Sequence, residues 1–278
     1  LDSKVSLTGT AEKLANTVKA LSGYGGDVTI EDNHDLPKLK TINEATTGTI
    51  KLAKDDIALT GSADDVAKAL DKITGYKGAI VLNTDHNLPQ LKTISGATSG
   101  KITLNNYKVK LDGLTADVEA ALRGDFKAAY QGDVQLQDAH NLPLLRAINN
   151  KTAGNIVLKD SFVSMNGSAS ELKEALSGIR DYHGMIMAFT ENSEILDLVE
   201  ISKSLIDTTR LRTIRVIGTH TDLAANATLL SKVNLDGGIL EIEGRDYTAA
   251  ELFAIRTATP DADIFIKDTG GGITSETD

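Results

Sequence analysis

A block of about 52 residues recurs along the chain, and this recurrence restricts the possible folds more than any other feature. The string that starts at Val5, VSLTGTAEKLANTVKALSGYGG, returns at Ile57 as IALTGSADDVAKALDKITGYKG. It returns again from Val109, and in more divergent form from Val163 and Ile214. One marker glycine per block falls at Gly9, Gly61, Gly113, Gly167 and Gly218, with spacings of 52, 52, 54 and 51 residues. A fixed period of this size is typical of stacked arrays, whose units bury their cores against their neighbours.

Each block shows the same order of predicted elements. Alternating apolar residues such as Val5 and Leu7 predict a half-buried strand, and the i, i+4, i+7 spacing of the next apolar residues predicts an amphipathic helix. A second strand, a short helix opened by Asx-Leu-Pro and a third strand complete the block. The predicted unit is therefore β-α-β-α-β.

Helix starts are the most specific local signals. Thr10, Ser62 and Ser168 are predicted N-caps, and Ser62 with Asp65 and Ser168 with Glu171 fit capping boxes. The Asx-Leu-Pro motif places an Asp or Asn cap ahead of a proline, which needs no donor in the first turn. It occurs at residues 35–37, 87–89 and 141–143.

The joint between one block and the next is short, for example Lys54-Asp55-Asp56. Such a joint cannot hold a parallel crossover, so it is either a hairpin or a bent continuous strand. The helix-containing connections fit βαβ crossovers. We therefore expect an α/β fold, an elongated solenoid-like array of five tandem β-α-β-α-β repeats. The predicted boundaries are 1–56, 57–108, 109–162, a divergent 163–213, a divergent 214–269 and a flexible tail at 270–278.

Composition excludes several classes of partner. The net charge is −10 with a pI near 5.0, which opposes binding to nucleic-acid phosphates or to an anionic membrane. Cysteine is absent, and the chain has neither a visible signal peptide nor an apolar run long enough for membrane insertion. It opens at Leu1 within a block, so we expect a segment of a longer protein or a processed form.

Acidic residues recur in the loops that lead into the short helices. Calcium binds six to eight oxygen ligands, and carboxylates repeated at unit junctions could supply them. Neither the EF-hand spacing nor the Gly-Gly-x-Gly-x-Asp nonapeptide occurs, and a solvated acidic edge with capping roles is the simpler alternative. The candidate calcium ligands are Asp32, Asp35, Asp85 and Asp138.

Two aromatic series could also bind ligands. His34, His86 and His140 are equivalent residues that could hold a transition metal, or could simply precede the helix caps. The tyrosines Tyr24, Tyr76, Tyr130 and Tyr182 could form a track for sugars. The favoured interpretation is that each tyrosine fills the gap between adjacent units with its hydroxyl at the surface.

Motifs of known enzymes are missing: nucleophile elbows, HExxH and dinucleotide-binding glycines do not occur. A catalytic pair would be expected to interrupt the repeat. The divergent stretch from Thr190 to Arg215, with Glu191, Glu194 and Asp197, is the best place for one. We expect no enzymatic activity.

The phrases LTGTAEKLANTVKALSGY and LKTINEATTGTIKL resemble tandem repeats of very large exported bacterial proteins, notably from cyanobacteria and marine bacteria. Such proteins are surface-layer, adhesin or haemolysin-type proteins. The resemblance covers the first three blocks well and the last two loosely. It implies an extracellular structural or adhesive role, often with calcium, and it transfers no catalytic residues.

Two functions remain open on this basis. The first is a non-catalytic structural or adhesive protein of a bacterial cell surface or extracellular fibrous assembly, which self-associates through repeat faces or ends. The alternative is a solenoid binding module that presents a broad face to a glycan or protein. Outward helix positions vary between blocks while loop residues repeat, which favours self-assembly.

Overall fold

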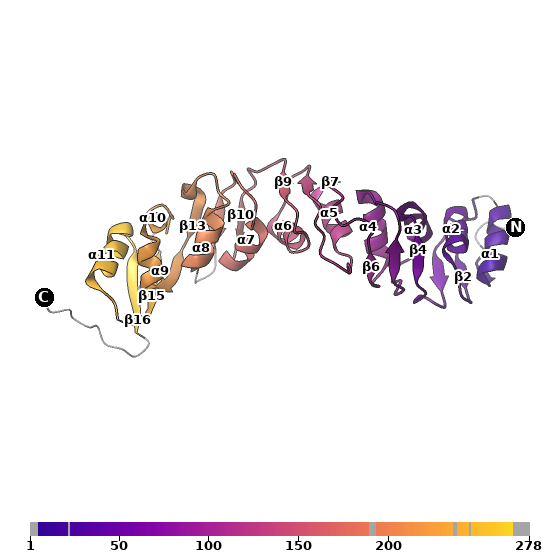
Figure 1. Cartoon of the computed structure of the whole chain (residues 1–278), viewed down its shortest axis with the longest axis horizontal. Coiled ribbons are helices and arrows are strands. Elements are labelled where there is room, and N and C mark those ends of the chain that lie inside the picture. Colours follow the sequence, from indigo (N-terminus) through magenta and orange to yellow (C-terminus); the bar gives the residue numbers. More distant parts are fainter. Residues whose placement is uncertain (1–4, 22, 189–192, 236–237, 245, 269–278) are drawn as a thin grey trace. The chain divides into compact units, whose positions relative to one another are not determined.

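The computed structural model describes residues 5–21, 23–188, 193–235, 238–244 and 246–268 (Figure 1). Strands and helices alternate along the chain, and every strand pair in the described part is parallel. The prediction of an α/β fold is confirmed at this level. The predicted tail at 270–278 lies outside the described residues.

The strands form separate parallel sheets, three-stranded in the first three repeats. The first contains β1 (Leu7–Gly9), β2 (Val28–Ile30) and β3 (Ile50–Leu52), joined by α1 (Ala11–Ala20) and α2 (Leu36–Ala45). The second contains β4 (Leu59–Gly61), β5 (Ile80–Leu82) and β6 (Ile102–Thr103), with α3 (Ala63–Leu70) and α4 (Leu88–Ala97). The third contains β7 (Leu111–Gly113), β8 (Val134–Leu136) and β9 (Ile156–Leu158), with α5 (Thr115–Leu122) and α6 (Leu142–Asn149).

The last two sheets belong to the divergent part of the sequence. One contains β10 (Met165–Gly167), β11 (Ile186–Ala188) and β13 (Leu211–Thr213), with α7 (Ala169–Leu176), α8 (Ile195–Ser202) and the 3-10 turn η1 (Thr208–Arg210). The other contains β12 (Ser193–Glu194), β14 (Arg215–Thr219), β15 (Ile239–Gly244) and β16 (Asp263–Asp268). Its helices are α9 (His220–Ala225), α10 (Ala227–Leu230) and α11 (Ala249–Ala258).

The chain divides into two compact units. The first comprises residues 1–137 and 151–157, and the second comprises residues 138–150 and 158–278. Each unit has a core of Leu, Ile, Val and Ala side chains, for example Ile30 and Leu39 in the first and Leu172 and Leu198 in the second, all fully buried. Burying such side chains from both sheets and helices is the main force that holds each unit together.

Consecutive repeats are joined by extended chain, and the hairpin alternative is wrong. β3 and β4 belong to different sheets, so the segment between them changes sheet instead of turning back. The carbonyl of Asp55 accepts hydrogen bonds from the backbone N–H groups of Lys77 and Gly78, at 2.7 and 3.0 Å. The chain therefore leaves the first sheet at the edge strand β3 and enters the second sheet at the edge strand β4.

Each predicted helix cap is formed, and one of the two predicted capping boxes is complete. Thr10, Asp35, Asn87, Asn141 and Ser168 each accept a backbone N–H at the start of a helix, and Ser168 with Glu171 forms a complete capping box.

The predicted box at Ser62 is only half formed. The Ser62 hydroxyl accepts from the Asp65 N–H, but the Asp65 carboxylate accepts from that hydroxyl and not from the cap backbone. Asp is one methylene shorter than Glu, the residue that completes the box at Ser168. At the equivalent position of the third repeat, Leu114 caps α5 without any side-chain hydrogen bond.

Candidate functional site

The four predicted calcium ligands lie in polar loops and are already engaged. An Asp32 carboxylate oxygen accepts from the Ala11 N–H at 2.7 Å, and Asp35 pairs with Lys38 at 2.7 Å. The Asp85 carboxylate accepts from two asparagine amides, and Asp138 also has an interaction partner. These hydrogen bonds hold the pKa of Asp35 and that of Asp85 below the ordinary value for aspartate.

The structure places Asp32 and Asp35 in one loop and Asp85 in the corresponding loop of the next repeat. Among the residues that the structure describes, no group of three or more His, Asp or Glu side chains could hold a metal ion. Calcium binding at these loops therefore stays a prediction, and the carboxylates of Asp32, Asp35 and Asp85 cap a helix or brace a loop.

The equivalent histidines lie directly ahead of the helix caps and contact tyrosines of the following repeat. Nε2 of His34 is 3.1 Å from the Tyr76 hydroxyl, and His86 is at the same distance from Tyr130. Within the second compact unit, His140 is 2.7 Å from the Tyr182 hydroxyl. The tyrosines are fully buried, so the prediction of surface hydroxyls is wrong, whereas the prediction that they fill gaps between adjacent units is confirmed.

Each of these tyrosine hydroxyls also donates to a backbone carbonyl at the entry to the first strand of its own repeat. Tyr76 donates to Ile57, Tyr130 to Val109 at 2.5 Å and Tyr182 to Val163 at 2.6 Å. A hydroxyl has one proton to donate, and here it donates that proton in the hydrogen bond to the carbonyl oxygen. The histidine Nε2 must therefore carry the proton that it donates to the tyrosine oxygen.

This arrangement fixes the tautomer of three histidines. With Nε2 protonated, Nδ1 is left as a bare acceptor, and Nδ1 of His34, His86 and His140 is buried without a hydrogen-bond partner. Burial lowers the pKa of all three imidazoles, against a smaller opposing effect of nearby aspartates. Burial likewise raises the pKa of the partner tyrosines Tyr76, Tyr130 and Tyr182. The pairs are neutral, and their chemistry is that of a structural clamp.

A second contact between successive repeats explains the marker glycines. A Cβ on Gly61 would lie 2.3 Å from Leu36 Cδ2, and a Cβ on Gly113 would lie 2.4 Å from Leu88 Cδ2. In the second compact unit the same geometry relates Gly167 to Leu142, at 2.3 Å. The leucine of each Asx-Leu-Pro motif therefore packs where the glycine of the next repeat has no side chain.

Helices of successive repeats also make a polar contact. Lys40 of α2 pairs with Asp65 of α3 at 2.5 Å, and Lys92 of α4 pairs with Asp117 of α5. In the second compact unit Arg146 of α6 pairs with Glu171 of α7 at 3.0 Å. Histidine, leucine and a base on one repeat thus meet tyrosine, glycine and an acid on the next.

At the junction of the fourth and fifth repeats, both the histidine and the tyrosine are missing from the sequence. The fourth repeat lacks the His-Asn-Leu-Pro sequence and forms β12, which pairs with β14. The Ser193 hydroxyl there bonds the Thr213 hydroxyl at 2.9 Å. Ile195 takes the place of the leucine, because a Cβ on Gly218 would lie 2.6 Å from its Cγ2.

Of the three acidic residues singled out in the divergent stretch from Thr190 to Arg215, the structure describes two. Glu191 lies outside the described residues, Glu194 lies on the short strand β12, and Asp197 pairs with Lys173 at 2.5 Å. The pairing with Lys173 ties α8 to α7.

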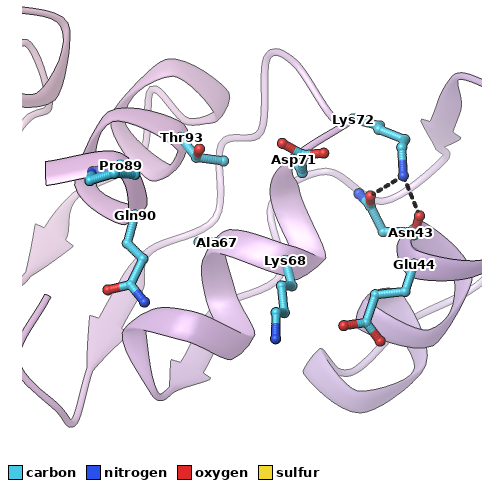
Figure 2. A pocket seen from close by; sticks show the side chains of 9 residues that line it. All are labelled: Asn43, Glu44, Ala67, Lys68, Asp71, Lys72, Pro89, Gln90 and Thr93. Atoms are coloured by element: carbon cyan, nitrogen blue, oxygen red, sulfur yellow. Dashed lines mark hydrogen bonds between the residues drawn. The ribbon is translucent and has the colours of Figure 1, made fainter. Parts of the chain in front are cut away.

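A shallow groove of about 260 Å³ lies on the helical surface of the first compact unit (Figure 2). Residues of α2, α3 and α4 line it, and Figure 2 shows charged side chains on its rim, including Glu44 and Lys68. Lys72 closes one side by bonding the Asn43 backbone carbonyl and side chain, at 2.5 and 3.2 Å. Sequence reasoning missed this groove, because it depends on how neighbouring helices pack.

No protein-family model matches the chain, and no match is found among curated proteins or solved structures. None of the helices in the described ranges combines the length and apolar character that crossing a bilayer requires.

Proposed function

We propose that this chain is a non-catalytic structural or adhesive repeat protein of a bacterial cell surface or extracellular fibrous assembly. Its five repeats stack as an elongated solenoid-like array, and the array self-associates through its faces or ends. The observation that carries the proposal is the clamp between successive repeats, in which a buried histidine, a buried tyrosine and a backbone carbonyl just ahead of a strand are joined.

The clamp supports a mechanical role because it consumes the polar groups that could otherwise bind a ligand. The three histidines are buried and hydrogen-bonded to tyrosine, and the tyrosine hydroxyls are bonded on both sides. Burying such groups is favourable only when they are paired, so each clamp fixes the register of one repeat on the next. Stacked units with fixed register give length and stiffness.

Negative-stain microscopy of the purified chain, with light scattering for mass, tests this function. We expect ordered filaments or sheets, and the comparison of calcium with a chelator examines the loops around Asp32, Asp35, Asp85 and Asp138. Monodisperse particles at all protein and calcium concentrations would contradict self-association.

The groove in Figure 2 favours a second candidate function, a binding module for a glycan or a protein. Its exposed lining is mostly apolar and its rim carries charged side chains, a combination that suits the apolar face and the hydroxyl groups of a sugar. A glycan array probed with the parent chain and with Lys68→Ala tests this alternative. Binding that the substitution removes would support the groove as the site, and equal binding by both proteins would exclude it.

A further inference from the structure

The first repeat has the tyrosine and the marker glycine that receive a preceding repeat, but among the described residues no preceding histidine or leucine contacts them. In the second, third and fourth repeats, the tyrosine hydroxyl meets a histidine of the preceding repeat. In the first repeat the Tyr24 hydroxyl is buried but has no hydrogen-bond partner. Tyr24 itself is only 5% exposed, so its hydroxyl lacks both a protein partner and full access to water. A buried hydroxyl without any hydrogen-bond partner costs free energy, and a histidine N–H that donates to its oxygen would supply one.

The marker glycine of the first repeat is also open. At Gly61, Gly113 and Gly167 the space of a side chain is taken by a leucine of the preceding repeat, whereas a Cβ on Gly9 would meet nothing closer than 4.0 Å. That atom belongs to Leu14 of the same repeat. The first repeat therefore lacks both the polar contact to its tyrosine and the apolar contact to its glycine that the next three repeats receive.

The position that holds an acid in the next three repeats holds a base in the first repeat. Asp65, Asp117 and Glu171 receive a base from the preceding repeat, but Lys13 stands at the equivalent position of the first repeat. A partner with a base there would be repelled. The matching side chain on the partner is an acid.

The chain's own described motifs do not supply this partner. His34, His86 and His140 are each hydrogen-bonded to a tyrosine of the chain itself. A second copy could therefore place one of these histidines against Tyr24 only by breaking one of its own histidine–tyrosine contacts. We propose that the face formed by β1 and α1 docks a further repeat unit of this class, with a His-Asx-Leu-Pro helix and an acid at the Lys40 position. The inference rests on the proposed function, because it names the partner through which one end of the array associates.

Fusion of a second copy of residues 5–56 directly ahead of Val5, with Lys40→Glu in the added copy, tests the proposal. Repeat stability is set by neighbouring units, so amide hydrogen exchange within β1 and β2 is the readout. The Leu7 and Glu31 amides are suitable because they donate to Asp27 and Gly9. We expect at least about tenfold slower exchange of both amides in the extended chain, as one buried hydrogen bond and one packed leucine are gained.

Tyr24→Phe at the original position is the discriminating variant. Because the unpartnered hydroxyl makes no hydrogen bond, its removal should not accelerate exchange in the parent chain. In the extended chain, where the hydroxyl accepts from a histidine N–H, the same substitution should accelerate exchange by about tenfold. Gly9→Ala should behave in the same way, since only the extended chain brings a leucine against it. Keeping Lys40 in the added copy should weaken the protection through repulsion by Lys13.

An extension that leaves exchange unchanged, or a Tyr24→Phe effect of equal size in both chains, would overturn the proposal. Neither result depends on whether the parent chain forms filaments. A failure of this docking is therefore separate from a failure of the proposed function.

Discussion

The Tyr130 hydroxyl makes two hydrogen bonds, and its removal deletes both. Tyr130→Phe deletes the hydrogen bond to the Val109 carbonyl and leaves the Nε2–H of His86 buried without an acceptor. We expect a loss of about 1–3 kcal/mol in the free energy of unfolding, measured by urea denaturation. Tyr24→Phe is the matched control and should cause no loss of stability, because the buried Tyr24 hydroxyl has no hydrogen-bond partner to lose. Equal effects of the two substitutions would refute the clamp.

Two glycines of the second repeat should respond to alanine in opposite directions. A Cβ on Gly78 would lie 2.0 Å from the carbonyl oxygen of Ile57, a backbone atom that cannot move aside, so Gly78→Ala should lower the urea midpoint strongly. Gly96 lies inside α4 with open space around its Cβ position. Gly96→Ala should stabilise by up to about 1 kcal/mol, because alanine loses less backbone entropy in a helix. A destabilising Gly96→Ala would show that α4 is packed differently.

At the scale of the element, the start of α5 is a weak point that its sister helices do not share. Leu114 is 52% exposed and gives no cap, whereas Ser62 and Ser168 cap α3 and α7. Leu114→Ser should raise the free energy of unfolding by about 1 kcal/mol, and Ser62→Ala should lower it by a similar amount. Thermal unfolding followed by far-ultraviolet circular dichroism measures both. No gain from Leu114→Ser would mean that the hydroxyl does not reach the Asp117 N–H.

Helices and strands differ in how well local sequence predicted them. The helices after Asp35, Asn87 and Asn141 were predicted with their caps, because capping depends on residues three positions apart. Strand β12 was not predicted, since Ser193 and Glu194 have no period-two pattern and pair only because β14 lies beside them. A short edge strand such as β12 exists only where a neighbouring strand pairs with it, and local sequence does not show which strand that will be.

At the scale of the whole molecule, three buried neutral histidines make stability depend on pH. Burial lowers the pKa of His34, His86 and His140 in the folded chain relative to the ordinary value of 6.5. Below that pH the unfolded chain binds protons that the folded chain does not, so stability is complete above about pH 6.5 and falls as pH decreases. Nearby aspartates reduce the effect: Asp32 and Asp35 at His34, Asp85 at His86, and Asp138 and Asp160 at His140.

Urea unfolding between pH 7.5 and 5 measures this dependence. Each histidine can contribute up to about 1.4 kcal/mol per pH unit, and the three act on separate junctions. Replacement of all three histidines by glutamine keeps an N–H donor for the tyrosines and removes the titration. The glutamine variant should therefore have a much flatter profile over this range. A parental profile that is equally flat would show that the imidazoles are not buried as neutral groups.

The sequence by itself determined the α/β class, the order of strands and helices in the first three repeats, and the caps, because these depend on periodicity and on contacts within a few residues. Only the tertiary structure decided what the repeated histidines, tyrosines and glycines do. His34 and Tyr76 are 42 residues apart and meet where the second repeat packs against the first. The Tyr76 hydroxyl donates its proton to the Ile57 carbonyl, so the imidazole of His34 must donate from Nε2. The repeat marked these positions in every intact block, but their pairing is a long-range contact. Local sequence carries no information about such a contact until one repeat lies against the next.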